Sequence, residues 1–124
     1  IKEIIIPINQ DNILKCYKIS KRIDDDISSV FMAINANLKN NTFKSIKIVC
    51  GGMAEIPKIA KSTQEYLLNK KFNQENINEA KKIIAKEFNP IDDMRASKEY
   101  RMKICKNLLE RFFNEQNKIN TLVY

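Results

Sequence analysis

The chain has 124 residues, 44% of them hydrophobic, and a formal net charge of +7 at pH 7. This length predicts one domain, and no apolar run approaches the roughly 20 residues that a membrane-spanning helix needs. Histidine is absent, which excludes the Ser-His and Cys-His nucleophile pairs.

The positive charge has two interpretations. One is attraction to nucleic acid or to another anionic surface. The other is compositional drift, because lysine, isoleucine and asparagine are all abundant and the lysines are scattered along the chain. We favour drift, since no nucleic-acid motif and no aromatic-plus-basic stacking platform accompanies the charge. Neither nucleic acid nor a membrane is an expected partner.

Cys16, Cys50 and Cys105 are far apart and form no CxxC pair. A zinc site or an Fe–S cluster held by this chain is therefore not expected. Scattered single cysteines are typical of a reducing compartment, and residues 1–7 are too short for the apolar region of a signal peptide. We expect a cytoplasmic protein. The chain starts without methionine inside an apolar segment, from which we expect a piece of a longer protein.

The first half of the chain is rich in β-branched residues, and four segments predict strands: 1–8, 13–20, 30–38 and 43–50. The apolar run in the third segment is also compatible with a helix. We favour a strand because Asn40-Asn41 suits a two-residue hairpin turn into the fourth segment. In that fourth segment Ile46, Ile48 and Cys50 fall on one face.

Gly51 and Gly52 are the only glycines of the chain, and they separate the predicted strands from the predicted helices. A place between a strand and a helix suits a phosphate-binding loop. The third glycine of the dinucleotide fingerprint and the Lys-Ser/Thr of the P-loop are missing, however. We therefore favour a tight turn with close backbone packing.

Three segments of the second half have apolar residues at helical spacing. Pro57 suits the first turn of a helix that ends near Asn69. Asn73 is the predicted N-cap of a second helix, which Pro90 stops. Ser97 is the predicted N-cap of a third helix, whose apolar face is formed by Ile104, Cys105, Leu108, Leu109 and Phe112.

These elements predict an α+β fold. A small antiparallel sheet of three or four strands is followed by three helices that pack on one face, as a two-layer sandwich. We expect strands over about residues 1–50 and helices over about 57–114. Residues 1–114 form the predicted domain, and residues 115–124 a polar tail.

Two charged stretches flank the predicted elements. Residues 24–26 are three aspartates without the ligand spacing of an EF-hand, so we favour a solvated loop. The alternative is a loop that positions one carboxylate against a partner surface. Asp93 and Arg95 precede the third helix, where a paired hydrogen bond would join two elements. Tyr100 is expected to anchor this helix onto the sheet.

Three stretches carry a family resemblance: Tyr17-Lys-Ile-Ser-Lys-Arg-Ile-Asp-Asp-Asp-Ile27, Gly51-Gly-Met-Ala-Glu-Ile-Pro57 and Asp93-Met-Arg-Ala-Ser-Lys-Glu-Tyr-Arg101. In this order and at these separations they resemble the C-terminal domain of the FAD-binding subunit of molybdenum hydroxylases. That family includes xanthine dehydrogenase and carbon monoxide dehydrogenase. The resemblance spans roughly residues 1–113 and is strongest toward xanthine dehydrogenase.

The resemblance implies the same fold, a small sheet followed by three helices. It also implies that an upstream domain holds most of the FAD, and that Fe–S clusters and molybdopterin lie in partner domains or subunits. In the family, the molybdenum centre hydroxylates a purine or a similar substrate, and the flavin passes electrons from the Fe–S clusters to NAD⁺. By itself the chain is expected to be inactive.

Three residues at the flavin are implied by the resemblance. Lys18 matches a lysine that contacts FAD in xanthine dehydrogenases. Arg22 and Asp25 match an arginine and an acidic residue of the loop beside the flavin ring. Animal versions carry a second arginine where this chain has Ile23, so a switch that depends on that arginine is not implied here. No residue is assigned a catalytic or metal-binding role.

The prediction is therefore an oxidoreductase flavoprotein domain of the xanthine dehydrogenase type. It would close one side of the flavin site and pack against the other domains during electron transfer. The alternative is a stand-alone basic protein-interaction module without a redox function.

Overall fold

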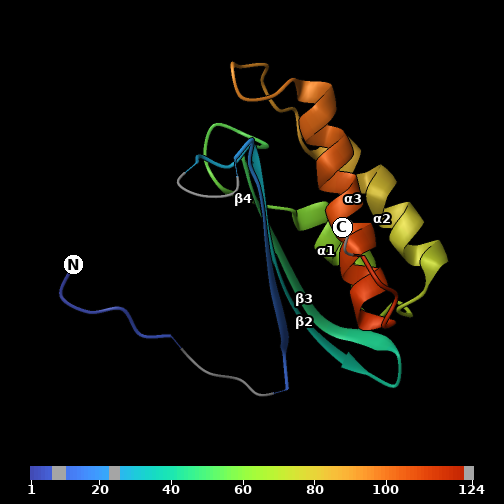
Figure 1. The fold of residues 1–124 in the computed structure, drawn as a ribbon. Coiled ribbons are helices and arrows are strands. Elements are labelled where there is room, and N and C mark those ends of the chain that lie inside the picture. The colour runs from blue at the N-terminus through green and yellow to red at the C-terminus, as the bar shows by residue number, and fades with distance from the viewer. Residues whose placement is uncertain (7–10, 23–25, 122–124) are drawn as a thin grey trace.

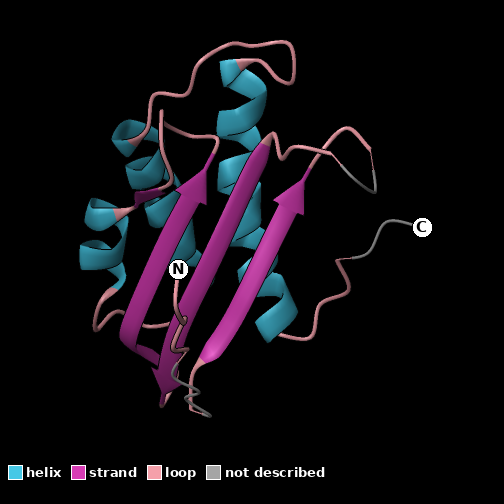
Figure 2. Ribbon diagram, turned by 90° about the vertical axis from the view of Figure 1, so that its left-hand side faces the viewer, coloured by secondary structure: helices cyan, strands magenta, loops and turns pink. Residues whose placement is uncertain are grey.

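The structure, a computed structural model, describes residues 1–6, 11–22 and 26–121. It contains a four-stranded antiparallel sheet in the order β1-β2-β3-β4. The elements are β1 (Ile13–Ile19), β2 (Val30–Lys39), β3 (Thr42–Gly51), β4 (Lys58–Ile59), α1 (Lys61–Leu67), α2 (Gln74–Glu87) and α3 (Lys98–Gln116). All three helices lie on one face of the sheet (Figure 1, Figure 2), which confirms the predicted α+β two-layer fold.

The long hairpin of β2 and β3 forms the centre of the sheet. Side chains of β2 alternate strictly, and its buried ones face the helices: Val30, Met32, Ile34 and Ala36. Asn40 and Asn41 form the turn with φ values of 50° and 55°, as the sequence predicts for a two-residue hairpin. The choice of a strand for this segment is confirmed.

A β-bulge changes the alternation of β3. Leu38 pairs with Phe43 while Asn37 pairs with Ser45, so one extra residue is inserted in β3. The insertion lets Phe43 and Ile46, three positions apart, both point into the core. Ile48 and Cys50 continue the same buried face, as predicted.

The fourth strand is not the predicted one. Residues 1–6 form no strand, and their isoleucines are exposed; residues 7 and 8 of the predicted strand lie outside the described residues. Lys58 and Ile59 instead pair with β3 at its free edge. A β-branched sequence indicates strand propensity, but whether a partner edge is in reach depends on the tertiary fold.

Pro57 does not begin a helix, which corrects the predicted start of α1. It precedes β4, and α1 begins only at Lys61. The side chain of Ala60, the N-cap residue, cannot cap. Glu87 of α2 does so instead, because its carboxylate accepts hydrogen bonds from the N–H groups of Ser62 and Thr63 at 2.9 and 3.2 Å.

The other two helix starts agree with the sequence. Asn73 caps α2 by accepting from the N–H of Asn76 at 3.0 Å, and Ser97 caps α3 by accepting from the N–H of Tyr100 at 3.2 Å. Their apolar stripes cover the sheet. At one end of the core, Phe43, Phe72 and Phe112 stack edge to face with ring centroids 5.3 and 5.9 Å apart.

Helix α3 extends to Gln116, two residues beyond the predicted end of the helical region. No helix within the described ranges is long and apolar enough to cross a membrane.

Candidate functional site

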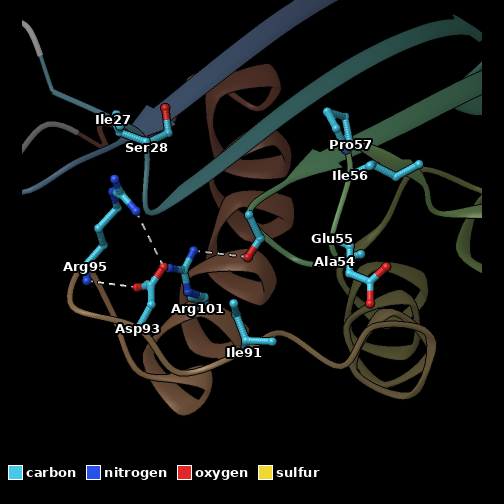
Figure 3. Close-up of a pocket in the computed structure, with 11 residues that line it drawn as sticks. Ile27, Ser28, Ala54, Glu55, Ile56, Pro57, Ile91, Asp93, Arg95 and Arg101 are labelled. Carbon is cyan, nitrogen blue, oxygen red and sulfur yellow. Dashed lines mark hydrogen bonds and ion pairs between the residues drawn. The ribbon is translucent and has the colours of Figure 1, made fainter.

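The three stretches that carry the family resemblance meet at one end of the sheet (Figure 3). In an antiparallel sheet the end of β1, the start of β2 and the end of β3 lie at the same end of the sheet. The connection before α3 folds over this end. A cavity of about 290 Å³ lies between them, with walls from residues 27–28, 52–57 and 91–101. We call this region the convergent end.

Arg101 holds the convergent end together. It is a residue of α3, only 3% exposed, and its guanidinium donates to two backbone carbonyls. One Nη bonds to the carbonyl of Ser29, before β2, and to the carbonyl of Gly52, after β3, the latter at 3.1 Å. The other Nη donates to Asp93 Oδ1 at 2.6 Å. A single side chain thus ties α3 to two strands and to the preceding loop.

Asp93 is the anionic partner in this network. Besides Arg101, its Oδ1 accepts from the N–H groups of Arg95 and Ala96 at 2.8 and 3.0 Å. These backbone hydrogen bonds lower the pKa of Asp93 to about 2, with Arg101 adding to the effect and partial desolvation opposing it. The guanidinium of Arg95 is farther away, at 3.8 Å from Oδ2.

The predicted structural contact before α3 therefore exists, but its main partner differs. Asp93 joins two elements as expected, through Arg101 and not through Arg95. Tyr100 does not anchor the helix, since it is 45% exposed. The signal for Arg101 is present in the sequence: it lies four residues before Cys105, at the head of the apolar stripe of α3. A charged residue in that stripe indicates a buried partner.

Gly52 is required by the same network. Its φ is +75°, a conformation that L side chains rarely adopt. A Cβ atom here would lie 2.3 Å from the carbonyl oxygen of Ser29 and 2.9 Å from the guanidinium of Arg101. Gly51 has no such constraint, because a Cβ there would be 3.5 Å from that of Phe31. The interpretation of a tight turn holds for Gly52.

Further hydrogen bonds hold the described part of the loop between β1 and β2. Lys21 Nζ donates to the carbonyl of Met94 at 2.8 Å. Asp26 accepts from the N–H groups of Arg22 and Ile27 at 3.1 and 2.9 Å. Partial desolvation would raise the pKa of Asp26, but these hydrogen bonds and the nearby Arg22 lower it below its ordinary value. Of the three aspartates, Asp26 therefore stabilises its own loop by accepting hydrogen bonds from the backbone.

Two of the three predicted flavin-contacting residues lie side by side. Lys18 alternates with the buried Tyr17 and so lies on the sheet face that the helices leave open. Lys18, Lys21 and Arg22 line one shallow hollow of about 400 Å³. The side chain of Arg22 is 76% exposed, and its Nε is 3.9 Å from Asp26. Asp25 lies outside the described residues.

Exposed apolar side chains lie at the convergent end. Ile27, Ile56 and Ile91 line the cavity of the convergent end and are 62%, 71% and 67% exposed, and Met94 nearby is 85% exposed. Four large apolar residues at one end, beside exposed cations, are typical of a surface that meets a ligand or another protein part. Sequence reasoning did not find them, because single apolar residues in loops have no periodicity.

A protein family and several known proteins match this chain. The family model for the CO dehydrogenase flavoprotein C-terminal domain matches residues 15–116. The chain is 27% identical over 115 residues to the glyceraldehyde dehydrogenase medium chain of Sulfolobus acidocaldarius, covering 93% of this chain and 41% of that protein. It is 42% identical over 60 residues to xanthine dehydrogenase of Emericella nidulans, covering 48% of this chain and 4% of that protein.

A solved structure has the same fold. Carbon monoxide dehydrogenase from Hydrogenophaga pseudoflava matches with a TM-score of 0.77 at 18% identity, over 84% of this chain and 36% of that chain. The likeness supports the fold alone at this identity. In each comparison the chain spans less than half of the longer relative.

Proposed function

Since the chain belongs to the family of CO dehydrogenase flavoprotein C-terminal domains, we propose that it closes one side of the flavin site in a molybdenum hydroxylase of the xanthine dehydrogenase type. The observation that carries the proposal is the convergent end. There the three resembling stretches meet, and Lys18 and Arg22 share one exposed hollow beside them.

The residues present suit FAD as a neighbouring group. A diphosphate, or the anion of a reduced flavin, needs cations, and Lys18 and Arg22 are exposed cations on one hollow. An isoalloxazine ring needs apolar contacts, which Ile27 and Ile56 offer at the adjacent cavity. When bound, the flavin would accept electrons and pass them to an acceptor, for which we propose NAD⁺.

This chain's own contribution is to position and to stabilise charge. Lys18 would neutralise negative charge on the flavin or its phosphates, and Arg22 would do the same from the loop that Asp26 and Lys21 hold in place. A carboxylate at Asp25 would oppose negative charge near the ring. The apolar residues would exclude water from the ring when the upstream domain packs against this end.

The described residues offer no ligand set for a metal cofactor. Within the described residues no group of three or more histidine, cysteine or acidic side chains lies close enough to hold a metal. Cys50 and Cys105 are buried in the core, and Cys16 stands alone on the sheet. We therefore place the Fe–S clusters and molybdopterin of the proposed enzyme in partner domains or subunits.

The test is Lys18→Ala in the whole enzyme, that is, this domain together with its upstream and partner parts. We expect roughly tenfold weaker FAD retention or slower NAD⁺ reduction, as loss of a charge-assisted contact of about 1.4 kcal/mol gives. Hydroxylation measured with an artificial acceptor that bypasses the flavin should be spared.

Lys47→Ala is the matched control, because Lys47 is an exposed lysine of β3 away from the convergent end. It should leave flavin content and NAD⁺ kinetics unchanged. Normal flavin content and NAD⁺ kinetics in the Lys18 variant would contradict the proposed role of Lys18 at the flavin.

A further inference from the structure

A groove runs between α2 and α3 on the side of the helical layer that faces away from the sheet. The two helices are antiparallel neighbours joined by residues 88–97 (Figure 1). Two hollows of about 630 and 700 Å³ follow one another along the groove, and both have Ala85 and Lys106 in their walls.

Lysines dominate the walls of this groove. Those that line it are Lys81, Lys82 and Lys86 from α2 and Lys98, Lys103 and Lys106 from α3. Glu110 pairs with Lys81 at 2.7 Å, and Glu79 pairs with Lys82 at 2.8 Å. The other four lysines form no ion pair among the described residues, and Glu99 is the single carboxylate in the walls. The groove therefore keeps a net positive charge.

The lysines are scattered along the sequence, but these six lie together in the folded chain. In the sequence the six lysines are spread over residues 81–106. Helical spacing places Lys82 and Lys86 one turn apart on α2, and Lys103 and Lys106 one turn apart on α3. Packing of the two helices then brings both rows to one groove.

Apolar atoms lie between the two rows of lysines. Ala85 and Met102 are half-buried in the walls, and Phe88 and Pro90 close the end near the connection. An occupant that matches this surface carries apolar side chains along its middle and carboxylates along both sides. An amphipathic helix has that pattern, and helices bind in grooves between helices.

Nucleic acid matches the groove less well. Its walls contain no arginine to pair with phosphate bidentately, and the one aromatic ring, Phe88, is 5% exposed and so offers no stacking platform. A nucleic-acid backbone would also leave the apolar middle of the groove unused.

We propose that the groove between α2 and α3 docks an acidic, amphipathic helix of a partner protein. The site lies on the helical layer, whereas Lys18 lies on the opposite face of the sheet. The proposal therefore does not depend on the flavin role.

The probe is a labelled peptide of about 18 residues, long enough to span α2 as a helix. Leucines follow one helical stripe, and glutamates flank it. Fluorescence anisotropy with the 124-residue chain would compare it with a scrambled peptide of the same composition and with a DNA duplex of the same charge. We expect the amphipathic peptide to bind about tenfold more tightly than either. When the peptide binds, the amide chemical shifts of the chain should change at α2 and α3.

A triple variant, Lys86→Glu with Lys103→Glu and Lys106→Glu, should weaken peptide binding more than about tenfold. The matched control is Lys39→Glu with Lys44→Glu and Lys61→Glu, which changes the net charge equally at exposed lysines outside the groove. The control should retain the affinity within about threefold, as screening of distant charges predicts.

The proposal would be overturned by absence of peptide binding, equal binding of the scrambled peptide, tighter binding of the duplex, or equal losses in the two triple variants. Shift changes in the wild-type chain that fall on the sheet would do the same, and that measurement does not depend on whether a variant folds.

Discussion

Arg101 lies on the buried face of α3, where the residues that follow on the same face are apolar. A buried guanidinium is tolerated only when its donors are paired. Here two carbonyls and one carboxylate supply the partners. The Nε of Arg101 has no hydrogen-bond partner among the described residues. The cost of burying the charge is offset by these hydrogen bonds, which join α3 to three other segments.

Arg101→Met tests this role. Methionine has a similar length but leaves the carbonyls of Ser29 and Gly52 without their donor, so we expect the free energy of unfolding to fall by about 3 kcal/mol. Urea denaturation measures it. Arg95→Met is the control: that side chain is 39% exposed, and its loss should cost less than about 1 kcal/mol. Equal effects of the two changes would contradict the central role of Arg101.

Asp93 predicts how stability depends on pH. Its pKa is lowered from an ordinary value of 3.8 to about 2 in the folded chain. A lowered folded pKa stabilises the fold above the unfolded pKa, and this stabilisation is lost as pH falls through the folded pKa. We expect the stability advantage of the wild-type chain over Asp93→Asn to shrink between about pH 4 and pH 2.

The comparison with Asp93→Asn isolates this group, because Asp26, Glu110 and Glu115, whose pKa values are also lowered, are present in both chains. Urea denaturation at several pH values across that window provides the measurement. A stability difference that stays constant from about pH 5 to about pH 2 would show that ionisation of Asp93 contributes nothing.

At the scale of elements, helices α2 and α3 begin where local chemistry says they should. Asn73 and Ser97 cap them through their own side chains. The connection from β3 to α1 behaves differently. There Gly52 turns the chain, Lys58 and Ile59 pair with the edge of β3, and the N–H groups of α1 are capped by a residue of another helix.

Gly52→Val tests the turn after β3. Valine is β-branched, strained at φ +75°, and its Cβ would collide with the backbone of Ser29. We expect a loss of at least about 3 kcal/mol in the free energy of unfolding, seen as a lower urea midpoint. Gly51→Ala, where space is ordinary, should change it by less than about 1 kcal/mol. An unchanged urea midpoint in the Gly52→Val variant would contradict the requirement for glycine at this turn.

At the scale of the whole molecule, two buried cysteines lie where α3 packs on the sheet. Cys50 of β3 and Cys105 of α3 are both fully buried, and their sulfur atoms are 4.0 Å apart. Contact with Cys105, together with burial, raises the pKa of the Cys50 thiol far above its ordinary value. Cys16 is exposed on the open face of the sheet.

This arrangement predicts the reactivity of the three cysteines. With an aromatic disulfide reagent at neutral pH, Cys16 should react rapidly in the folded chain, since the reactive thiolate must be accessible. Cys50 and Cys105 should react only in denaturant. Mass spectrometry of the labelled peptides identifies each site. Rapid labelling of Cys105 without denaturant would mean that α3 does not pack on the sheet as described.

Much of the fold was predictable from the sequence. The alternation in β2 and β3, the Asn40-Asn41 turn and the caps of α2 and α3 are local features, each encoded within a few neighbouring residues. The resemblance of three ordered stretches also indicated the family, which the match over residues 15–116 confirms. The roles of Lys18, Arg22 and Asp25 toward FAD stay predictions.

What only the tertiary structure decided involves residues far apart in the chain. Strand propensity in residues 1–6 could not show that β3 pairs with Lys58 and Ile59 instead, because pairing depends on which edge is free. Nor could local pattern show that Arg101 meets Ser29 and Gly52, or that two rows of lysines share a groove. These contacts join segments separated by many residues, so their energies exist only once the sheet and helices are packed together.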